Sequence, residues 1–577
     1  MKNRWNKTEA ARCTDALALR AYSSRLLGSD KSLVMHGGGN TSVKLTQTNL
    51  FGEKEEILYV KGSGSSLETI EPSGFVPVRL AGVRRLIELD TLPPQRMAEE
   101  FSAQALRPGA PSIESILHAI LPYKYVEHTH ADTVLAITNT IDSERHLRSA
   151  FGDRALIVPY HDSGLALAKA CAAVFTAQAT SRTIGMVLLH HGILAFGHSA
   201  RASYEHMVAL VNDAEAYLRR QGAWALSSLS RETKNTRPIT TAIAALRRDI
   251  SSAAGFPLLL TRRDDPLIHG FVNRPDLAQI SQQGPATPHH AIFTKRAPLL
   301  GADVTAFSAQ YRQYMKDNRP AAEKEFFLDP APRIVLTPEF GLCAAGISAH
   351  YANAAAEIYR HTIEIISRAS LIDAYQALPP ADILAAEIEY GGFERALLVR
   401  RPPENQWLGT IALVAHADSP MGRQCIAALL AGGAAVVGLE SGATAADRPS
   451  APAYRGIVCD AADKTMLEHA LEQLTDAFGG LDMLITDDLS LMESCLPLLK
   501  LSPVQGRVSF LSPQGQALTV FQQMAAILAP DNIRFNAVSY APAESERAAR
   551  LAAELCGPLF AGTTGALIPV HGPNLVS

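Results

Sequence analysis

Cysteine is scarce in this sequence, and its cysteines are not paired. The 577 residues contain seven cysteines, and no two of them form a Cys-x-x-Cys motif. Such scattered cysteines argue against a disulfide framework and against a thiolate zinc site. We therefore expect a protein of the reducing cytoplasm.

Long apolar runs and an excess of one charge are also absent. No run approaches the roughly 18 consecutive apolar residues of a membrane-spanning helix, and the polar segment Met1–Lys7 leads into no apolar signal region. The formal net charge of −4 gives no electrostatic reason to expect a nucleic-acid partner. We expect neither a membrane nor a nucleic acid as a partner.

What is present is the composition of an ordinary globular protein. Charged residues make up 19% of the chain and hydrophobic residues 47%. At roughly one domain per 150 residues, the length predicts three or four domains.

A strand with two histidines organises the first third of the chain. Residues 126–130 read Val-Glu-His-Thr-His, and an apolar segment follows at 133–137. Since side chains alternate along a strand, His128 and His130 point to the same face, where two imidazoles can chelate one cation. The alternative is a pair of surface histidines, because the chain contains 18 histidines.

A second pair of histidines ends another apolar strand. Residues 186–192 read Met-Val-Leu-Leu-His-His-Gly. Adjacent strand residues face opposite ways, so only one of His190 and His191 can join the first pair. Three imidazoles with an open fourth position are typical of a catalytic metal site.

Two glycine-rich loops and an acidic helix start precede the first histidine pair. The loops His36–Lys44 and Lys61–Ser66 favour a phosphate or polyol cradle, although each alone also fits an ordinary turn. Residues 111–121 predict a helix with Ser112 as its N-cap and Glu114 in its first turn, where a glutamate complements the helix dipole. His118, one turn later, fits a packed helix histidine.

These motifs, taken together, resemble the class II aldolase/adducin family. They are His36-Gly-Gly-Gly-Asn-Thr-Ser, Pro111-Ser-Ile-Glu, Glu127-His-Thr-His and Leu189-His-His-Gly, in this order. The chain is most similar to the rhamnulose-1-phosphate aldolase-like subgroup that is fused to a short-chain dehydrogenase.

The resemblance implies a role for each matching residue. A divalent ion (zinc, manganese or cobalt) would bind to His128, His130 and His191, and Glu114 would be the acid/base residue. The remaining matches would line the pocket for a substrate phosphate or hydroxyl: Gly39, Asn40, Ser63, Gly64 and Ser112. The family also uses a tyrosine, often from a neighbouring subunit, for which Tyr160 and Tyr204 are candidates, and it suggests a homotetramer.

The chemistry of an aldolase fits these residue types. A metal that is chelated by the substrate stabilises an enediolate as a Lewis acid, and a nearby carboxylate moves the proton. We expect a lyase of carbohydrate metabolism that cleaves a small sugar or sugar phosphate into dihydroxyacetone phosphate, or a similar ketone, and an aldehyde. Epimerisation and decarboxylation through the same enediolate are alternatives within the family.

The patterns predict an α/β protein with three parts. They are a class II aldolase-like α/β/α domain at 1–225, a mixed α/β region at 237–395 that completes or covers it, and a doubly wound Rossmann-like domain at 406–577. Residues 222–236 and 400–405 read as linkers. We expect His289 and His290, in the middle region, to lie in a solvated turn.

The last domain resembles a short-chain dehydrogenase but departs from that family at its functional positions. The phosphate turn, residues 415–422, keeps one glycine, Gly422, and carries Asp418, whose charge would repel a pyrophosphate. No tyrosine and no lysine lies between Val508 and Arg534, so the catalytic Tyr-x-x-x-Lys motif has no counterpart. We predict a degenerate domain that does not bind NAD(P) at physiological concentration.

Two other functions are considered. The first is a bifunctional enzyme that also oxidises the aldehyde product with NAD(P), which the missing Tyr/Lys pair speaks against. The second is a non-catalytic binding or scaffolding protein of the adducin type. That function is ranked last because the chain keeps all three histidines and the glutamate.

Overall fold

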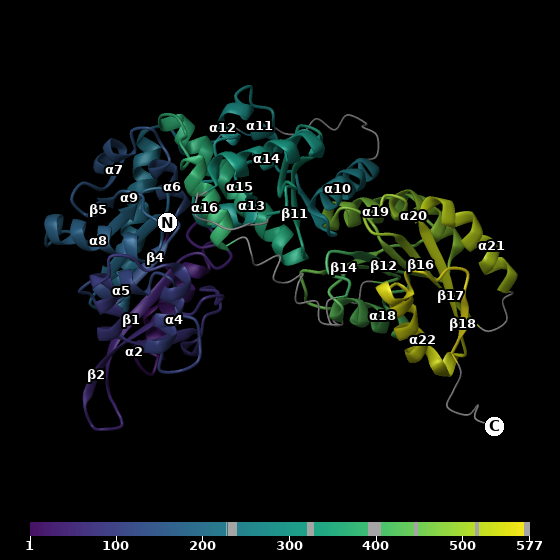
Figure 1. Cartoon of the computed structure of the whole chain (residues 1–577), viewed down its shortest axis with the longest axis horizontal. Coiled ribbons are helices and arrows are strands. Elements are labelled where there is room, and N and C mark those ends of the chain that lie inside the picture. Colours follow the sequence, from purple (N-terminus) through teal and green to yellow (C-terminus); the bar gives the residue numbers. More distant parts are fainter. Residues whose placement is uncertain are drawn as a thin grey trace. The chain divides into compact units, whose positions relative to one another are not determined.

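A computed structural model of the chain describes residues 1–226, 228, 239–319, 328–390, 406–442, 448–513 and 518–570. Within these residues, three β-sheets follow one another along the chain, with helices packed on their faces (Figure 1). The predicted α/β class is therefore confirmed. The predicted linker at 400–405, and most of that at 222–236, lie outside the described residues.

The chain packs as two compact units. The first unit consists of Met1–Ser227, Gln283–His290 and Arg360–Pro379, and the second of the remaining residues. Two short segments of the predicted middle region thus belong to the first unit.

The first sheet has seven strands in the order β3-β2-β1-β4-β7-β6-β5. All neighbours are antiparallel except β5 and β6. The strands are β1 (Asn40–Thr48), β2 (Lys54–Lys61), β3 (Phe75–Arg79), β4 (Tyr125–Thr129), β5 (Ala155–Val158), β6 (Gly185–Leu188) and β7 (Gly192–Gly197). The helices are α1 (Lys7–Ala10), α2 (Ala16–Gly28), α3 (Leu80–Arg85), α4 (Pro94–Gln104), α5 (Ser115–Ile120), α6 (Asp132–Thr138), α7 (Ser143–Phe151), α8 (Leu165–Gln178) and α9 (Ala200–Arg220).

Helices cover both faces of this sheet. One face packs against α3, α4, α5 and α8 in an apolar core that includes Val126, Leu194 and Phe196. Helices α2 and α9 contact the strands from the other face (Figure 1). Because β4 is covered on both sides, every one of its residues is buried.

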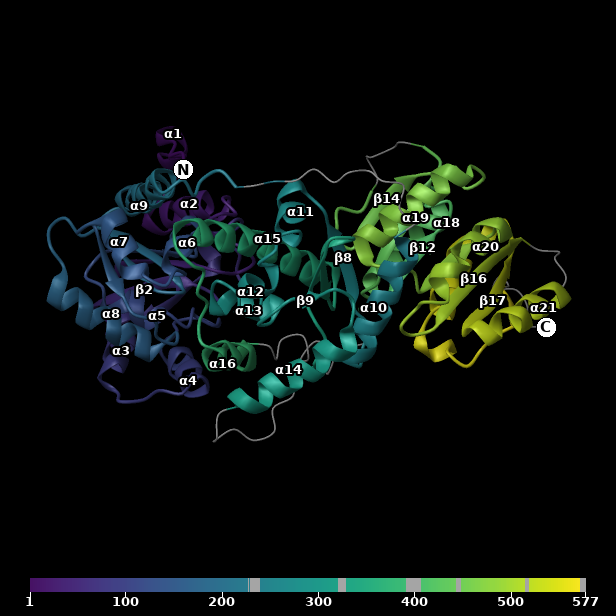
Figure 2. The same ribbon diagram turned by 90° about the horizontal axis from the view of Figure 1, so that it is seen from above.

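The second sheet has four strands in the order β8-β11-β10-β9. Helices α10 and α14 pack with it around a shared apolar core (Figure 2). The strands are β8 (Leu259–Arg263), β9 (Leu299–Leu300), β10 (Ile334–Thr337) and β11 (Gly341–Gly346). The helices are α10 (Thr240–Ala254), α11 (Pro266–Val272), α12 (Leu277–Ser281), α13 (Pro288–Thr294), α14 (Val304–Asn318), α15 (Ala349–Ile372) and α16 (Pro380–Tyr390).

The second sheet repeats the arrangement of half of the first. The four strands β4 to β7 are arranged in the order β4-β7-β6-β5, and the four strands β8 to β11 in the order β8-β11-β10-β9. In each set, the strand that is first in the chain pairs antiparallel with the fourth, and the fourth pairs antiparallel with the third. The second strand then pairs in parallel with the third. The register agrees as well, because Tyr125 lies opposite Gly197 and Leu259 opposite Gly346. Arg262 therefore occupies the position in β8 that His128 occupies in β4.

The third sheet is parallel throughout and has the order β14-β13-β12-β15-β16-β17-β18. This order is that of a doubly wound Rossmann-type sheet, as predicted. The strands are β12 (Ile411–Val414), β13 (Ala435–Glu440), β14 (Tyr454–Val458), β15 (Met483–Thr486), β16 (Gly506–Pro513), β17 (Ile533–Tyr540) and β18 (Leu567–Pro569). The helices are α18 (Pro420–Ala431), α19 (Lys464–Phe478), α20 (Leu489–Leu499), α21 (Leu518–Leu528) and α22 (Ser545–Leu555).

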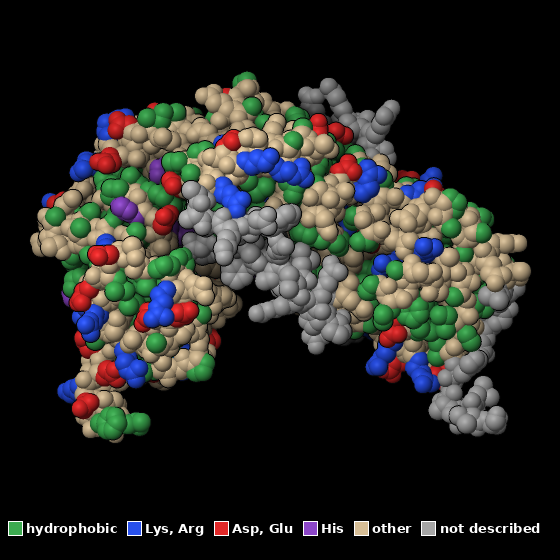
Figure 3. All heavy atoms as spheres, in the orientation of Figure 1, with side chains coloured by type: hydrophobic (Ala, Val, Ile, Leu, Met, Phe, Trp, Pro, Cys, Tyr) green, Lys and Arg blue, Asp and Glu red, His purple; other side chains and the backbone are tan. Residues whose placement is uncertain are grey.

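Charged side chains of both signs are interspersed on the face of the molecule drawn in Figure 3. This distribution agrees with the small net charge of −4. Among the described helices, none combines the length and the apolar character that crossing a membrane requires.

Candidate functional site

Three histidines converge at one end of β4. His128 lies on β4, His130 directly follows that strand, and His191 precedes β7. One ring nitrogen from each lies within 4.8 Å of the others. The side chains are 1%, 9% and 7% exposed, respectively, so the cluster is buried.

The strand geometry aligns the rings of His128 and His130. Their Nε2 atoms lie 3.1 Å apart. The Nδ1 atom of His128 donates to the carbonyl of Ile193 over 3.2 Å, which leaves the Nε2 lone pair of His128 for a cation. Burial lowers the pKa of His128 to about 4 and holds that of His130 well below its usual range, so both rings are neutral near pH 7.

Gly192 makes room for this cluster. A Cβ atom at Gly192 would lie 2.3 Å from the carbonyl oxygen of Thr129, 3.0 Å from His128 Cε1 and 3.1 Å from His130 Cδ2. Only glycine fits there without displacing the strand or the rings.

The sequence predicted that His190 and His191 end a strand. In the structure they lie in a turn instead. The strand β6 ends at Leu188, and His190 has a left-handed backbone with φ 55°. The Nδ1 atom of His190 lies 2.9 Å from Asn139 Oδ1, whereas His191 joins the cluster. The expectation that only one of the two reaches the first pair agrees with this placement, although the turn and not strand alternation separates them.

Glu114 faces the histidines with both carboxylate oxygens. Oε1 lies 3.2 Å from His191 Nε2, and Oε2 lies 3.6 Å from His128 Nε2. Burial raises the pKa of Glu114, but His128, His191 and the Asn40 amide outweigh burial and hold that pKa well below its usual range. The carboxylate is therefore ionised.

The local structure around Glu114 differs from the prediction. Helix α5 begins at Ser115, and Glu114 is the residue before it rather than part of its first turn. Ser112 is not the N-cap, but its Oγ accepts from the Glu114 N–H over 3.3 Å. The resulting turn directs the carboxylate inward, to a position where its side chain does not cap the helix.

Asn40 and His118 hold the Glu114 carboxylate in place. Asn40, which lies opposite His128 in the β1–β4 ladder, donates from Nδ2 to Glu114 Oε2 over 2.6 Å. His118 Nε2 lies 2.5 Å from Asn40 Oδ1, and its Nδ1 lies 2.8 Å from Ser42 Oγ. Because burial lowers the pKa of His118 to about 3, this ring is a neutral donor that fixes the orientation of the amide.

The second glycine-rich loop, Lys61–Ser66, and the segment before α5 lie side by side. Ser63 N–H donates to the carbonyl of Ala110 over 2.7 Å, and Ser112 N–H donates to that of Lys61 over 3.1 Å. Gly64 has φ +81° and borders open space. The predicted pocket residues Ser63, Gly64 and Ser112 are thus brought together.

Gly39 lies in the other loop and ties it to β4. Its φ is +66°, and a Cβ atom there would lie 2.7 Å from the His128 carbonyl oxygen. The loop therefore runs close against β4, the strand that carries His128, and it brings Asn40 to Glu114.

Lys61 joins the two loops and was missed by the sequence analysis. Its Nζ atom donates to the Gly37 carbonyl over 3.1 Å, and the side chain is 4% exposed. Burial lowers the pKa of Lys61 to about 8, while the nearby Glu114 opposes that effect. The sequence feature that could have identified Lys61 is its position directly before the segment Gly-Ser-Gly-Ser.

The prediction of a solvated turn at His289 and His290 is wrong. Both residues lie in α13, and His290 is 1% exposed. The ring of His289 lies 5.3 Å from that of His130, measured between ring centroids. His289 thus belongs to the surroundings of the histidine cluster.

Neither candidate tyrosine is placed at the cluster by its described contacts. Tyr160 donates to Asp162 Oδ1 over 3.1 Å, and Tyr204 accepts from the Arg4 N–H over 3.0 Å. The side chain of Tyr204 is fully buried and packs near Trp5.

The cluster fits a divalent cation. Glu114 Oε1 is buried and lacks a hydrogen-bond partner among the described residues, although it faces His191. A buried carboxylate oxygen is rarely left without a partner, and three imidazoles beside it can supply lone pairs. His128, His130 and His191 would hold the ion, with Glu114 next to it.

The second sheet lacks such a cluster at the equivalent position. Arg262 takes the place of His128, and Asp264, two residues on, takes that of His130. The guanidinium of Arg262 pairs with Asp264 over 2.6 Å and with Asp476 over 3.2 Å. An ion pair thus stands where the first sheet has imidazoles.

Carboxylates lie at the carboxyl ends of β12 and β13 in the third sheet. Asp418 accepts hydrogen bonds from the N–H and the hydroxyl of Ser441, at the end of β13. Gly422 lies in the first turn of α18, where a Cβ atom would lie 2.2 Å from the His416 carbonyl oxygen. Glu440 is occupied by Arg448 and by the Tyr454 hydroxyl. A carboxylate lies in the turn where a pyrophosphate would need N–H donors.

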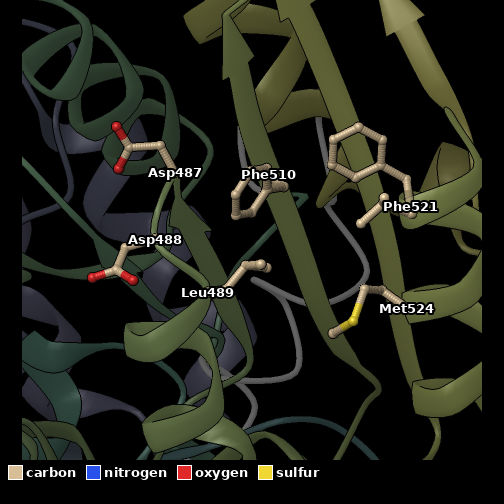
Figure 4. A pocket seen from close by; sticks show the side chains of 7 residues that line it. Asp487, Asp488, Leu489, Phe510, Phe521 and Met524 are labelled. Atoms are coloured by element: carbon tan, nitrogen blue, oxygen red, sulfur yellow. The ribbon is translucent and has the colours of Figure 1, made fainter. Parts of the chain in front are cut away.

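A cavity of about 400 Å³ lies at the carboxyl ends of β15 and β16 (Figure 4). Its lining is largely apolar, with two carboxylates at one side: Asp487, Asp488, Leu489, Phe510, Val520, Phe521 and Met524.

Comparisons with known proteins give the family. Residues 19–218 match the class II aldolase and adducin N-terminal domain, and residues 238–398 match the second domain of class II aldolases. The N-terminal class II aldolase domain of a conserved protein from Thermoplasma acidophilum is 36% identical, and the match covers 38% of this chain and all of that one, with a TM-score of 0.35. The chain belongs to the class II aldolase/adducin family.

Two further matches cover most of the chain or a smaller part of it. An uncharacterized oxidoreductase of Bacillus subtilis, YuxG, is 27% identical over 522 residues, which cover 84% of this chain and 74% of that protein. A short-chain dehydrogenase/reductase from Serratia marcescens is 20% identical, with 28% of this chain and 95% of that one covered and a TM-score of 0.23. In this protein, class II aldolase domains are followed by a domain that is built on a doubly wound Rossmann-type sheet.

Proposed function

We propose that the first domain is a divalent-metal-dependent aldolase that cleaves a small sugar or sugar phosphate. The observation that carries this proposal is the buried Glu114 Oε1, which has no hydrogen-bond partner among the described residues and faces His191, one of three clustered imidazoles. The family assignment supports aldolase-type chemistry. Metal dependence, substrate and reaction direction belong to the proposal.

Retro-aldol cleavage needs one group to accept charge and another to move protons. When the carbon–carbon bond breaks, its electron pair stays on the ketone half, next to the carbonyl. A divalent ion on His128, His130 and His191 would supply the Lewis-acid charge at that carbonyl oxygen. Glu114 is ionised and lies beside this position, so in cleavage it would take the proton of the hydroxyl that becomes the aldehyde carbonyl and return that proton to the carbon of the ketone half. In the reverse direction it would remove the proton from that carbon.

The residues behind Glu114 keep it in position for this transfer. Asn40 holds Oε2, while His118 holds Asn40, so the carboxylate has one oriented oxygen and one that faces the histidines. The loops at Gly39, Ser63, Gly64 and Ser112 border the same site and would bind the polar end of the substrate.

Two alternatives remain for the whole protein. The first alternative is an additional dehydrogenase activity. It is supported by the name of YuxG, an oxidoreductase, and by the cavity at the carboxyl ends of β15 and β16, where doubly wound sheets bind ligands. Asp418 and the missing Tyr/Lys pair oppose that activity, and we infer that this domain does not transfer hydride by the family's mechanism. A scaffold of the adducin type would not need the Glu114 arrangement.

The experiment measures the metal content of the protein and its ability to exchange a carbon-bound hydrogen of the ketone substrate. Elemental analysis of the purified chain is expected to find about one divalent ion per chain. The protein should also exchange a carbon-bound hydrogen of dihydroxyacetone phosphate, or of dihydroxyacetone, with D₂O. A chain that takes up no metal and catalyses no exchange after reconstitution with zinc, manganese or cobalt contradicts the proposal.

A further inference from the structure

A second cavity of the first unit lies at the end of its sheet that is away from the histidine cluster. Its volume is about 680 Å³, and its lining comes from β1, from the segment before β4 and from the segment after β7. His128 pairs with Asn40 at one end of the β1–β4 ladder, whereas Lys44, which lines the cavity, follows the last pair at the other end. Ligand sites for small molecules have volumes of roughly 300–1,000 Å³.

Three cationic side chains line this cavity without a carboxylate partner. They belong to Lys44, Arg84 and Lys124, and none of the three forms an ion pair with a residue that the structure describes. Burial and, second to it, the Arg84 guanidinium lower the pKa of Lys44 to about 7, while Glu56 opposes both. Lys44 and Arg84 thus carry like charges close together, and a cavity with such a lining attracts an anion.

These cations keep N–H groups for a ligand. Lys44 Nζ donates one hydrogen bond, to the Leu121 carbonyl, and Arg84 Nε donates one to the Ala119 carbonyl over 3.3 Å. An ammonium and a guanidinium each have further N–H groups beyond the one used here. The Lys124 side chain makes no hydrogen bond within the described ranges of the chain. Donors for a phosphate are therefore available on all three side chains.

The backbone and α5 hold the two lysines in place. Ser42 Oγ lies 2.8 Å from His118 Nδ1, and Lys44, the next residue but one on the same face of β1, bonds to Leu121 just after the helix. The Lys44 N–H also donates to the Lys124 carbonyl over 2.9 Å. A charged group on such a rigid support is suited to bind a ligand in one position.

The rest of the lining offers hydrogen-bond acceptors. Asp15 and Glu56 are exposed at the cavity, and Gln47 lies near them in its lining. Carboxylates repel a phosphate but accept hydrogen bonds from hydroxyl groups. The lining therefore fits a molecule that has an anionic end and hydroxyl groups, and its volume is larger than an inorganic ion needs.

We propose that this cavity binds a small phosphate ester with hydroxyl groups, and that Lys44, Arg84 and Lys124 hold its phosphate. The inference goes beyond the proposed aldolase and does not rest on it. Because the cavity and the histidine cluster lie at opposite ends of the same strands, this ligand is not the substrate that the cluster would cleave.

The test uses pyridoxal 5′-phosphate, a phosphate ester that carries an aldehyde, on the full chain. A neutral lysine amine adds to the aldehyde and releases water, and borohydride then adds hydride to the C=N bond, so the label becomes permanent. Peptide mass spectrometry measures the label on each lysine. Pyridoxal, which lacks the phosphate, is the matched probe, because the ratio of the two labelling rates removes the intrinsic reactivity of each amine.

The ratio of labelling by the phosphorylated probe to labelling by pyridoxal should be about tenfold higher at Lys44 than at the exposed Lys7. Glycerol phosphate in excess should protect Lys44, and glycerol should not. The ratio should fall about tenfold in Arg84→Gln and in Lys124→Gln, since each removes a charged donor to the phosphate. Arg148→Gln is the control, because it removes an exposed arginine of α7 that does not line the cavity.

Three results would overturn the assignment. They are an unlabelled Lys44, equal ratios at Lys44 and Lys7, and a ratio that neither Arg84→Gln nor Lys124→Gln lowers. Thermal unfolding is recorded for every variant, and if Arg84→Gln unfolds, the exposed Lys124→Gln decides alone. His191→Ala should keep the wild-type ratio whether or not the aldolase proposal holds, so the failure of one proposal is distinguishable from the failure of the other.

Discussion

Glu114 Oε1 lies 3.2 Å from Nε2 of His191 and has no hydrogen-bond partner among the described residues. The other oxygen of the same carboxylate is held by Asn40 over 2.6 Å. One oxygen is thus fixed, and the other is directed at the imidazoles. Because of this asymmetry, the proposed proton transfer by Glu114 and the proposed metal binding by the three histidines can be tested with different variants.

Glu114→Gln should keep the metal and lose turnover. The amide has nearly the same shape and can still hydrogen-bond to Asn40, but it cannot take up a proton. Removal of a general acid or base lowers rates by roughly 10²- to 10⁴-fold. The measurement is ketone hydrogen exchange beside elemental analysis. Activity close to wild type in this variant would show that another group moves the proton.

His191→Ala should lose most of its metal and its activity. Two imidazoles remain, and a third ligand is needed for the three-histidine site of a catalytic metal. His190→Ala is the matched control, since His190 contacts Asn139 instead of the cluster. Elemental analysis of both variants decides the point. Equal metal content in the two would refute the assignment of His191 as a ligand.

A buried ion pair supports β4 from the face opposite the histidines. Arg20 NH2 lies 2.7 Å from Glu127 Oε1, and both side chains are fully buried. Arg20→Met should therefore lower the free energy of unfolding by about 3–5 kcal/mol, because Glu127 is left as a buried charge without an oppositely charged partner, and only the Ser203 hydroxyl still donates to it. Urea unfolding measures this loss. In the double variant with Glu127→Gln, most of the stability should return; if it does not, lost packing of Arg20 is the cause.

The two-residue period of a strand predicted that His128 and His130 share a face, and the structure brings both into one cluster with His191. Their role as metal ligands stays a prediction. The doubly wound sheet was also predictable, since buried parallel strands read as short apolar runs such as Ile411–Val414.

The contributions of distant segments were not predictable in the same way. His289 reaches the cluster because Thr362 and Tyr375 anchor its segment, and these contacts join residues 72 and 91 positions apart in the chain. No local pattern records such contacts. The same holds for Lys61, which is buried because two loops close over it, whereas lysine is usually exposed.

The repeat between the first two sheets was hidden by substitution. The strands Gly192–Gly197 and Gly341–Gly346 share a glycine at each end. At the positions of His128 and His130, however, the second sheet has Arg262 and Asp264. The same close backbone contact excludes a side chain at Gly197 and at Gly346. A Cβ atom on either would approach the backbone nitrogen of the residue six positions on, to 2.8 and 2.3 Å.

The dehydrogenase-like domain should not bind NAD(P) at physiological concentration. Asp418 and Glu440 occupy the region where the phosphates and the ribose of a dinucleotide would lie, and both already hold protein partners. Calorimetric titration of the full chain with NAD⁺ and NADP⁺ should give no signal. A clear binding isotherm that disappears in Gly422→Trp would reverse this conclusion.

Glu387 should make the stability of the second unit depend on pH. Burial raises the pKa of this carboxyl from 4.5 to about 7, although the Tyr311 hydroxyl donates to it over 2.5 Å. Because the folded-state pKa is above the ordinary value, the folded state holds the proton more tightly. This stabilisation is complete below about pH 4.5 and is lost as the pH rises toward 7.

A shift of this size corresponds to about 3 kcal/mol of unfolding free energy across that range. Glu387→Gln carries no such proton, so its stability relative to wild type should increase between pH 4.5 and 7. Urea unfolding of both proteins at several pH values measures the difference, with Glu472→Gln on the exposed side of α19 as the control. A constant difference between wild type and Glu387→Gln over this range would show that the carboxyl stays ionised in the fold, paired with the nearby Lys295.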